Sequence, residues 1–139
     1  MARTEIPNRN TAELTQEQRR QATQELKKFF QLVNMIDVEK YKMFSGAVDA
    51  VWHELLKDPD AYAAFLEEAG VVENIGHMPG SGFGVIQWIQ DYHQRYGKLT
   101  PIWFTDASGV LDEKSYNAYL STDVVVAAWD CGVMVPVLE

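Results

Sequence analysis

Two of the three histidines in the chain, His53 and His77, stand close to tryptophan, glycine and carboxylate residues. Imidazole exchanges a proton or binds a metal ion near neutral pH without special surroundings. Asp49 precedes His53 by four residues, a spacing that places both side chains on one side of a helix. The carboxylate can then fix the tautomer of the ring. We predict a catalytic site in which Asp49 orients His53 as a general base or ligand, and His77 acts as a second base, ligand or oxyanion donor.

The same residue types are common metal ligands. His53 and His77, with Asp49 or with Cys131, would form a three-ligand set that leaves one position open on a divalent metal ion. The spacing along the sequence matches no short metal motif, so these ligands would meet only in the fold. A buried and inert thiol is the competing interpretation of Cys131, because the neighbouring Asp130 opposes thiolate formation.

Two better-known motifs are excluded by particular residues. A zinc-protease helix needs a second histidine four residues after the first, and Lys57 stands there after His53. The glycine-rich segment 80–84 resembles an anion-binding loop before a helix. It lacks both a dinucleotide fingerprint and a Walker lysine, so we interpret it as a turn with Ser81 as a cap.

The expected pocket lies between the helix that carries His53 and the loop 76–84. Tryptophan supplies large apolar walls, and glycine allows the backbone to approach a ligand closely. The predicted ligand-binding residues are Trp52, Gly76, Ser81 and Trp88. In the competing structural interpretation the tryptophans are core anchors, and both histidines bond buried backbone carbonyls.

Apolar residues recur at helical spacing through most of the chain. Thr15 and Gln18 match a capping box at the start of the first helix, and Asp112 is a candidate cap for the last one. The expected helices cover about residues 16–34, 36–57, 58–70, 85–97 and 116–120. We expect irregular structure over 71–81, an extended segment over 101–105, a turn over 106–109, and strands over 124–129 and 133–138.

These elements predict a mainly α protein of the α+β class, a bundle of four to five helices with a small β element near the C-terminus. Residues 1–14 lack a periodic apolar pattern, so we expect a flexible lead there. Residues 15–139 are expected to form a single globular helical domain, which agrees with the chain length of 139 residues.

Charge and composition restrict the class of partner. The chain carries 12 basic and 20 acidic residues, and its formal net charge is −8. An acidic surface repels phosphate backbones, so direct binding of nucleic acid is not expected. The sequence holds no apolar run long enough to span a membrane, and one cysteine permits no internal disulfide. We expect a cytoplasmic protein without a membrane partner.

The segment 48–79 carries a recognisable arrangement of residues. It reads Val48-Asp49-x-Val51-Trp52-His53, then Leu55 or Leu56, Pro59, Tyr62 and Phe65, and finally His77-x-Pro79. It resembles the Trp-His-containing helical domain of the glycine-rich domain-containing proteins and their bacterial relatives. The matching positions are Asp49, Trp52, His53 and His77. That family has no generally assigned reaction, and the chain departs from its pattern from Gly97 onward, so the resemblance implies site residues without a substrate.

Two functions remain open at the level of sequence. The first is an accessory enzyme or small-ligand-binding protein that uses His53 and His77 in an aromatic pocket lined by histidine and aspartate. The alternative is an acidic interaction module that binds a basic protein or peptide, with both histidines in structural roles.

Overall fold

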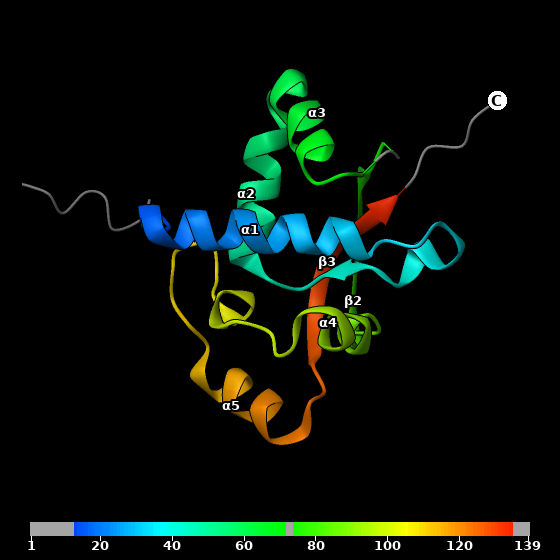
Figure 1. Cartoon of the computed structure of the whole chain (residues 1–139). Helices are drawn as coiled ribbons and strands as arrows, with labels where there is room; N and C mark the ends of the chain where they lie inside the picture. Colours follow the sequence, from blue (N-terminus) through cyan, green and yellow to red (C-terminus); the bar gives the residue numbers. More distant parts are fainter. Residues whose placement is uncertain (1–12, 72–73, 135–139) are drawn as a thin grey trace, which may run out of the picture.

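The first helix, α1 (Gln16–Leu32), begins at the capping box that the sequence predicts, with Thr15 as the N-cap. The computed structural model describes residues 13–71 and 74–134. The predicted lead therefore lies outside the described residues, apart from its last two. The elements that follow α1 in chain order are η3 (Met35–Lys40, a 3₁₀ helix), β1 (Lys42–Met43), α2 (Gly46–Leu56), α3 (Pro59–Glu68), β2 (Gly76–Val85), α4 (Ile89–Tyr96), η4 (Pro101–Phe104, a 3₁₀ helix), α5 (Glu113–Thr122) and β3 (Val126–Met134) (Figure 1).

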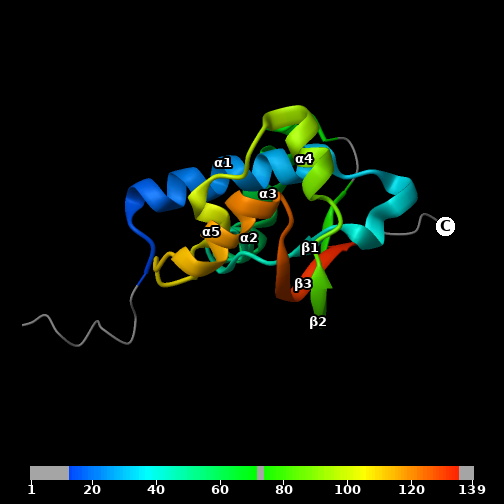
Figure 2. The same cartoon turned by 90° about the horizontal axis from the view of Figure 1, so that it is seen from below.

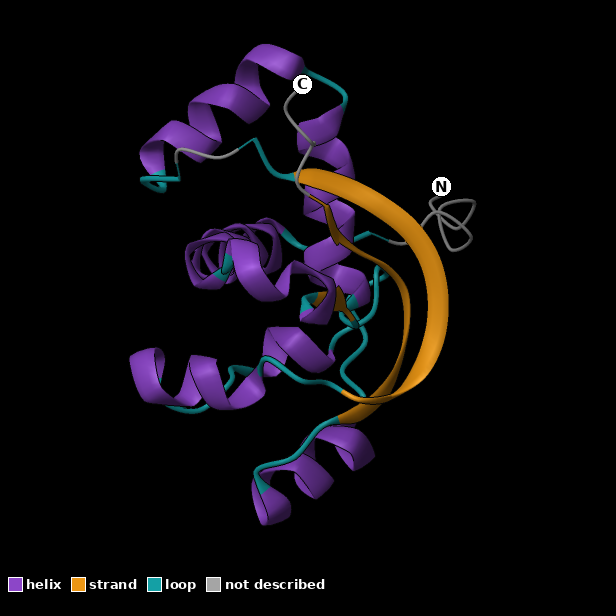
Figure 3. Ribbon diagram, turned by 90° about the vertical axis from the view of Figure 1, so that its right-hand side faces the viewer, coloured by secondary structure: helices purple, strands orange, loops and turns teal. Residues whose placement is uncertain are grey.

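The fold is mainly helical with a small antiparallel sheet, as the sequence predicts. The strand order is β1-β3-β2, so the last strand lies in the middle (Figure 2). The register of β2 on β3 runs from Gly76 opposite Met134 to Val85 opposite Val126, with an irregularity between Pro79 and Gly82. Figure 3 shows the two long strands curving around one side of the helices.

An aromatic core joins the helices to this sheet. Phe29 of α1 lies at its centre, with ring centroids 5.0 Å from Trp88, 6.0 Å from Trp103 and 6.3 Å from Trp52. These three tryptophans are fully buried, in agreement with their expected role as core anchors. Tilted and edge-on aromatic pairs of this kind add to the stabilisation that comes from burial alone.

One carboxylate, that of Glu25, is buried within the aromatic core. It accepts hydrogen bonds from the hydroxyl of Tyr92 and from the indole nitrogen of Trp103, and it pairs with Lys28 at 3.0 Å. The pKa of Tyr92 is raised well above its ordinary value by burial and by the negative charge of Glu25. Glu25 therefore links α1 to α4 and η4 through polar contacts inside an apolar region.

The predicted second helix is wrong in its first half. The chain leaves η3, pairs with β3 through Lys42 and Met43, and starts α2 only after the Ser45 N-cap. The hydroxyl of Ser45 accepts from the amide of Val48 at 3.1 Å. Tyr41, directly before β1, and Met43 within it are both buried. This alternation merges with the helical spacing of α2, so the apolar residues imitate one long helix.

The prediction of irregular structure before the fourth helix is also wrong. Residues 76–85 form strand β2, and α4 begins at Ile89. Glycine is unusual in strands, but a Cβ atom at Gly82 would lie 2.6 Å from the Trp129 ring, so close packing requires glycine there. Residues 101–104 form a 3₁₀ helix in place of an extended segment, since Pro101 is pre-organised for a first helical turn.

The C-terminal strands are one strand. Residues 126–134 form β3 without interruption, and 135–138 lie outside the described residues. The predicted cap of α5 is confirmed, because Asp112 accepts from the amide of Ser115 in the first turn of that helix. Asp58 caps α3 in the same way. Among the described residues, no helix has the length and apolar character that crossing a membrane requires.

We predict that Glu25→Ala lowers the free energy of unfolding by about 3 kcal/mol, because it leaves the Tyr92 hydroxyl and the Trp103 indole buried without an acceptor. Chemical denaturation measures this loss. Glu17→Ala on the exposed side of the same helix is the matched control and should change stability little. Equal effects of the two substitutions would contradict the assigned role of Glu25.

Candidate functional site

Helix α2 separates its apolar and polar sides cleanly. Val48, Val51 and Trp52 are buried in the core. Asp49 and His53 lie on the adjoining side, where 54% of the His53 side chain is exposed. The prediction that Asp49 and His53 lie on one side of a helix is therefore confirmed.

Strand β2 brings His77 to this side of α2. Each carboxylate oxygen of Asp49 approaches one of the two rings, with Oδ2 at 3.2 Å from Nε2 of His53 and Oδ1 at 3.5 Å from Nε2 of His77. The ring centroids of the histidines are 4.6 Å apart and the rings are inclined by 73°. One ligand atom from each of the three residues lies within 4.8 Å of the others. The predicted proximity of Asp49, His53 and His77 is confirmed, and we call these three residues the Asp–His–His cluster.

His77 is the more buried of the two histidines. Its side chain is 16% exposed, and its ring meets the Trp52 ring edge-on at a centroid distance of 4.7 Å. Nε2 of His77 is buried and has no hydrogen-bond partner among the described residues, because Asp49 lies outside hydrogen-bonding geometry. A buried polar atom without a partner costs about 1–3 kcal/mol. The structural interpretation, in which the protein satisfies every ring nitrogen, does not fit this atom.

Cys131 contacts the Asp–His–His cluster from strand β3. Its thiol is buried and donates to Oδ1 of Asp49 at 3.2 Å. Burial, with the negative charges of Asp49 and Asp130, raises the pKa of this thiol far above its ordinary value. The thiol is therefore protonated at neutral pH and acts as a hydrogen-bond donor to Asp49. It is not one of the three clustered ligand atoms, in contrast to its place among the predicted metal ligands.

A buried chain of hydrogen bonds fixes α2 against the start of β2. The indole of Trp52 donates to the hydroxyl of Tyr62 at 3.2 Å, and this hydroxyl donates to the carbonyl of Ile75 at 2.5 Å. Ile75 lies two residues before His77, so this chain sets the position of the strand that carries the histidine. The sequence predicts Tyr62 on the third helix but does not predict its positioning role. That role depends on the contact of its buried hydroxyl with Trp52, which forms only in the fold.

The other predicted ligand-binding residues are more widely spread. Trp52 contacts His77, and Gly76 directly precedes that histidine in β2. Ser81 is exposed in β2, near the irregularity in the sheet. Trp88 is fully buried in the aromatic core and donates to the carbonyl of Lys42 at 2.9 Å.

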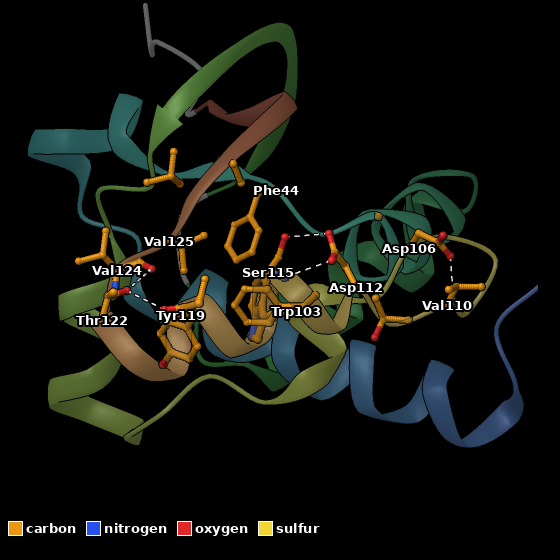
Figure 4. A pocket seen from close by; sticks show the side chains of 16 residues that line it. Phe44, Trp103, Asp106, Val110, Asp112, Ser115, Tyr119, Thr122, Val124 and Val125 are labelled. Atoms are coloured by element: carbon orange, nitrogen blue, oxygen red, sulfur yellow. Dashed lines mark hydrogen bonds between the residues drawn. The ribbon is translucent and has the colours of Figure 1, made fainter.

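A large cavity lies elsewhere, between η4, α5 and the start of β3 (Figure 4). Its volume is about 910 Å³. Phe44, Trp103 and Tyr119 form aromatic walls, and Asp112 and Ser115 contribute polar atoms that already bond each other. The Asp–His–His cluster is not part of its lining. No motif in the sequence predicts this cavity, because most of its lining consists of ordinary side chains from residues 103–127, and Phe44 and Gly46 join them only in the fold.

Gly46 serves this second region. A Cβ atom at Gly46 would lie 2.9 Å from the backbone nitrogen of Ala107. The glycine at the start of α2 therefore allows the loop 106–107 to approach the helix closely.

Comparison with known proteins finds no family model, curated protein or solved structure that matches the chain. The resemblance over residues 48–79 stays a prediction, and the function is argued from the geometry.

We predict that Tyr62→Phe removes part of the stability loss at alkaline pH. Burial raises the pKa of Tyr62 from 10.0 to about 12. Between these values the unfolded chain releases the proton and the folded protein retains it, so the free energy of unfolding falls as pH rises. Thermal unfolding at about pH 9 and about pH 11 measures the fall, which should be smaller in the variant. An equal fall in both proteins would contradict the burial of this hydroxyl.

Proposed function

We propose that the chain is a small-ligand-binding protein that works as an accessory enzyme, with the Asp–His–His cluster as its reactive group. One observation carries this proposal. The half-exposed imidazole of His53 is paired with the carboxylate of Asp49. This carboxylate also accepts a hydrogen bond from the buried thiol of Cys131. The single cysteine of the sequence also suits a reducing compartment such as the cytoplasm.

In the metal-free protein, His53 would act as a general base. Nε2 of His53 lies 3.2 Å from Oδ2 of Asp49, so in the tautomer with the proton on Nε2 this proton faces the carboxylate and Nδ1 offers its lone pair as the proton acceptor. The exposure of the ring allows a small ligand to reach it. Asp49 stabilises the imidazolium that forms, and the thiol of Cys131 keeps the carboxylate oriented.

His77, on strand β2, would contact the same ligand as His53 on helix α2. Its ring is held edge-on by Trp52, 4.6 Å from the His53 ring, so both rings can address one small molecule. The unpartnered Nε2 supports a role in binding, because a histidine kept only for structure would have its nitrogens satisfied by the protein.

The alternative from the sequence, an acidic module that binds a basic partner, remains a second proposal without a specific contact in its favour. Glu68 pairs with Lys27 at 3.3 Å. Binding of a basic partner would weaken strongly with salt and would be lost on charge reversal at Glu67, Glu68 and Glu73.

The ester p-nitrophenyl acetate probes the basicity and accessibility of His53. We predict that the metal-free protein hydrolyses it, that His53→Gln lowers the rate to background, and that Asp49→Asn lowers it by about tenfold or more. The release of nitrophenolate is followed by absorbance, and melting temperatures should change little for His53→Gln because the ring is half exposed.

His93→Gln is the matched control for this assay. The ring of His93 contacts the hydroxyl of Tyr119 at 2.6 Å, away from the cluster, so its loss should leave the rate unchanged. A rate in His53→Gln equal to that of the unaltered protein would overturn the proposed function.

A further inference from the structure

We propose that Asp49, His53 and His77 bind one divalent transition-metal ion of the zinc class and leave one coordination position open to solvent. This inference deepens the proposed function and rests on it for the idea that a small ligand comes to this site. With the ion bound, both histidines become ligands, and the small ligand occupies the open position.

The spacing of the ligand atoms suits a zinc ion. Two ligands about 2.0–2.1 Å from a zinc ion, at a tetrahedral angle, lie about 3.4 Å from each other. The separations between Asp49 and the two histidines are 3.2 Å and 3.5 Å. These two separations involve different oxygens of the Asp49 carboxylate. One ligand atom from each of the three residues lies within 4.8 Å of the other two, so a small rotation of the exposed His53 ring would complete the set.

The surroundings of Nε2 of His77 favour a cation. This buried atom faces the Asp49 carboxylate at 3.5 Å without forming a hydrogen bond. When Nε2 carries its lone pair, two electron-rich groups face each other across a partly buried space, which is unfavourable. A cation between them removes the repulsion and gives the nitrogen a partner.

Neighbouring side chains hold Asp49 and His77 in place. The thiol of Cys131 donates to Asp49, and the Trp52 ring packs against His77. Metal sites depend on such outer contacts, which hold the ligands before the ion arrives. The exposed side of the cluster, at His53, leaves room for water or a small ligand at the fourth position.

The donor set determines the class of ion. Two imidazole nitrogens with one carboxylate suit zinc and its neighbours, whereas magnesium and calcium prefer sites made of oxygen. The sulfur of Cys131 is not among the three clustered ligand atoms, so the proposed set contains no sulfur ligand.

The test is a titration of the metal-free protein with Co²⁺ followed by visible absorption, and with Zn²⁺ followed by calorimetry. We expect one equivalent of each ion, no sulfur-to-cobalt charge-transfer band, and no heat with Mg²⁺. His53→Ala and His77→Ala should each weaken zinc binding by at least about 100-fold, more than loss of an outer-shell contact does. His93→Ala should leave it unchanged.

His53 is half exposed, so the His53→Ala variant should fold, and thermal unfolding verifies this. Unaltered zinc affinity in this variant would overturn the proposal. A strong sulfur-to-cobalt band would also overturn it, because Cys131 would then replace a member of the cluster. Hydrolysis of p-nitrophenyl acetate is measured without metal, so failure of the metal proposal is distinguishable from failure of the proposed function.

Discussion

The carboxylate of Asp49 is the point at which the site is held together. Side chains from three elements contact it: His53 from the next turn of α2, His77 from β2 and Cys131 from β3. A half-buried carboxylate loses hydration and is stabilised only when protein donors or cations replace the water. The sheet and helix α2 therefore meet at the Asp49 carboxylate, whose negative charge is stabilised by nearby donors. The two histidines are brought together at the same place.

The aromatic core fixes the position of α2 relative to β2. Trp52 is next to His53 in sequence, but its ring is fully buried in the group of aromatic rings around Phe29. Its indole also reaches Tyr62, whose hydroxyl binds the Ile75 carbonyl. The same residue thus anchors the helix, positions the strand that carries His77, and provides the wall against which that histidine packs.

Much of the helical structure follows from local signals. The capping box at Thr15 and the aspartate caps at Asp58 and Asp112 identify helix starts because each depends only on nearby residues. The sheet does not follow from such signals. Strand β2 contains glycines that argue against a strand, and its pairing with β3 joins residues about fifty positions apart.

The candidate site shows the same division. The placement of Asp49 and His53 on one side of α2 comes from helical geometry, so the sequence predicts it. The arrival of His77 matches the prediction, although the sequence assigned it to a loop and not to a strand. The thiol contact of Cys131 and the hydroxyl bridge of Tyr62 depend on long-range packing, and single-sequence patterns contain no information about them.

A crystal structure of the protein grown with zinc, with anomalous data collected at the zinc absorption edge, tests the central role of Asp49 most directly. We predict one anomalous peak about 2.0–2.2 Å from Nε2 of His53, Nε2 of His77 and a carboxylate oxygen of Asp49, with the Cys131 sulfur outside the coordination sphere. A peak elsewhere, or a structure in which Nε2 of His77 bonds a protein group remote from Asp49, would contradict this account.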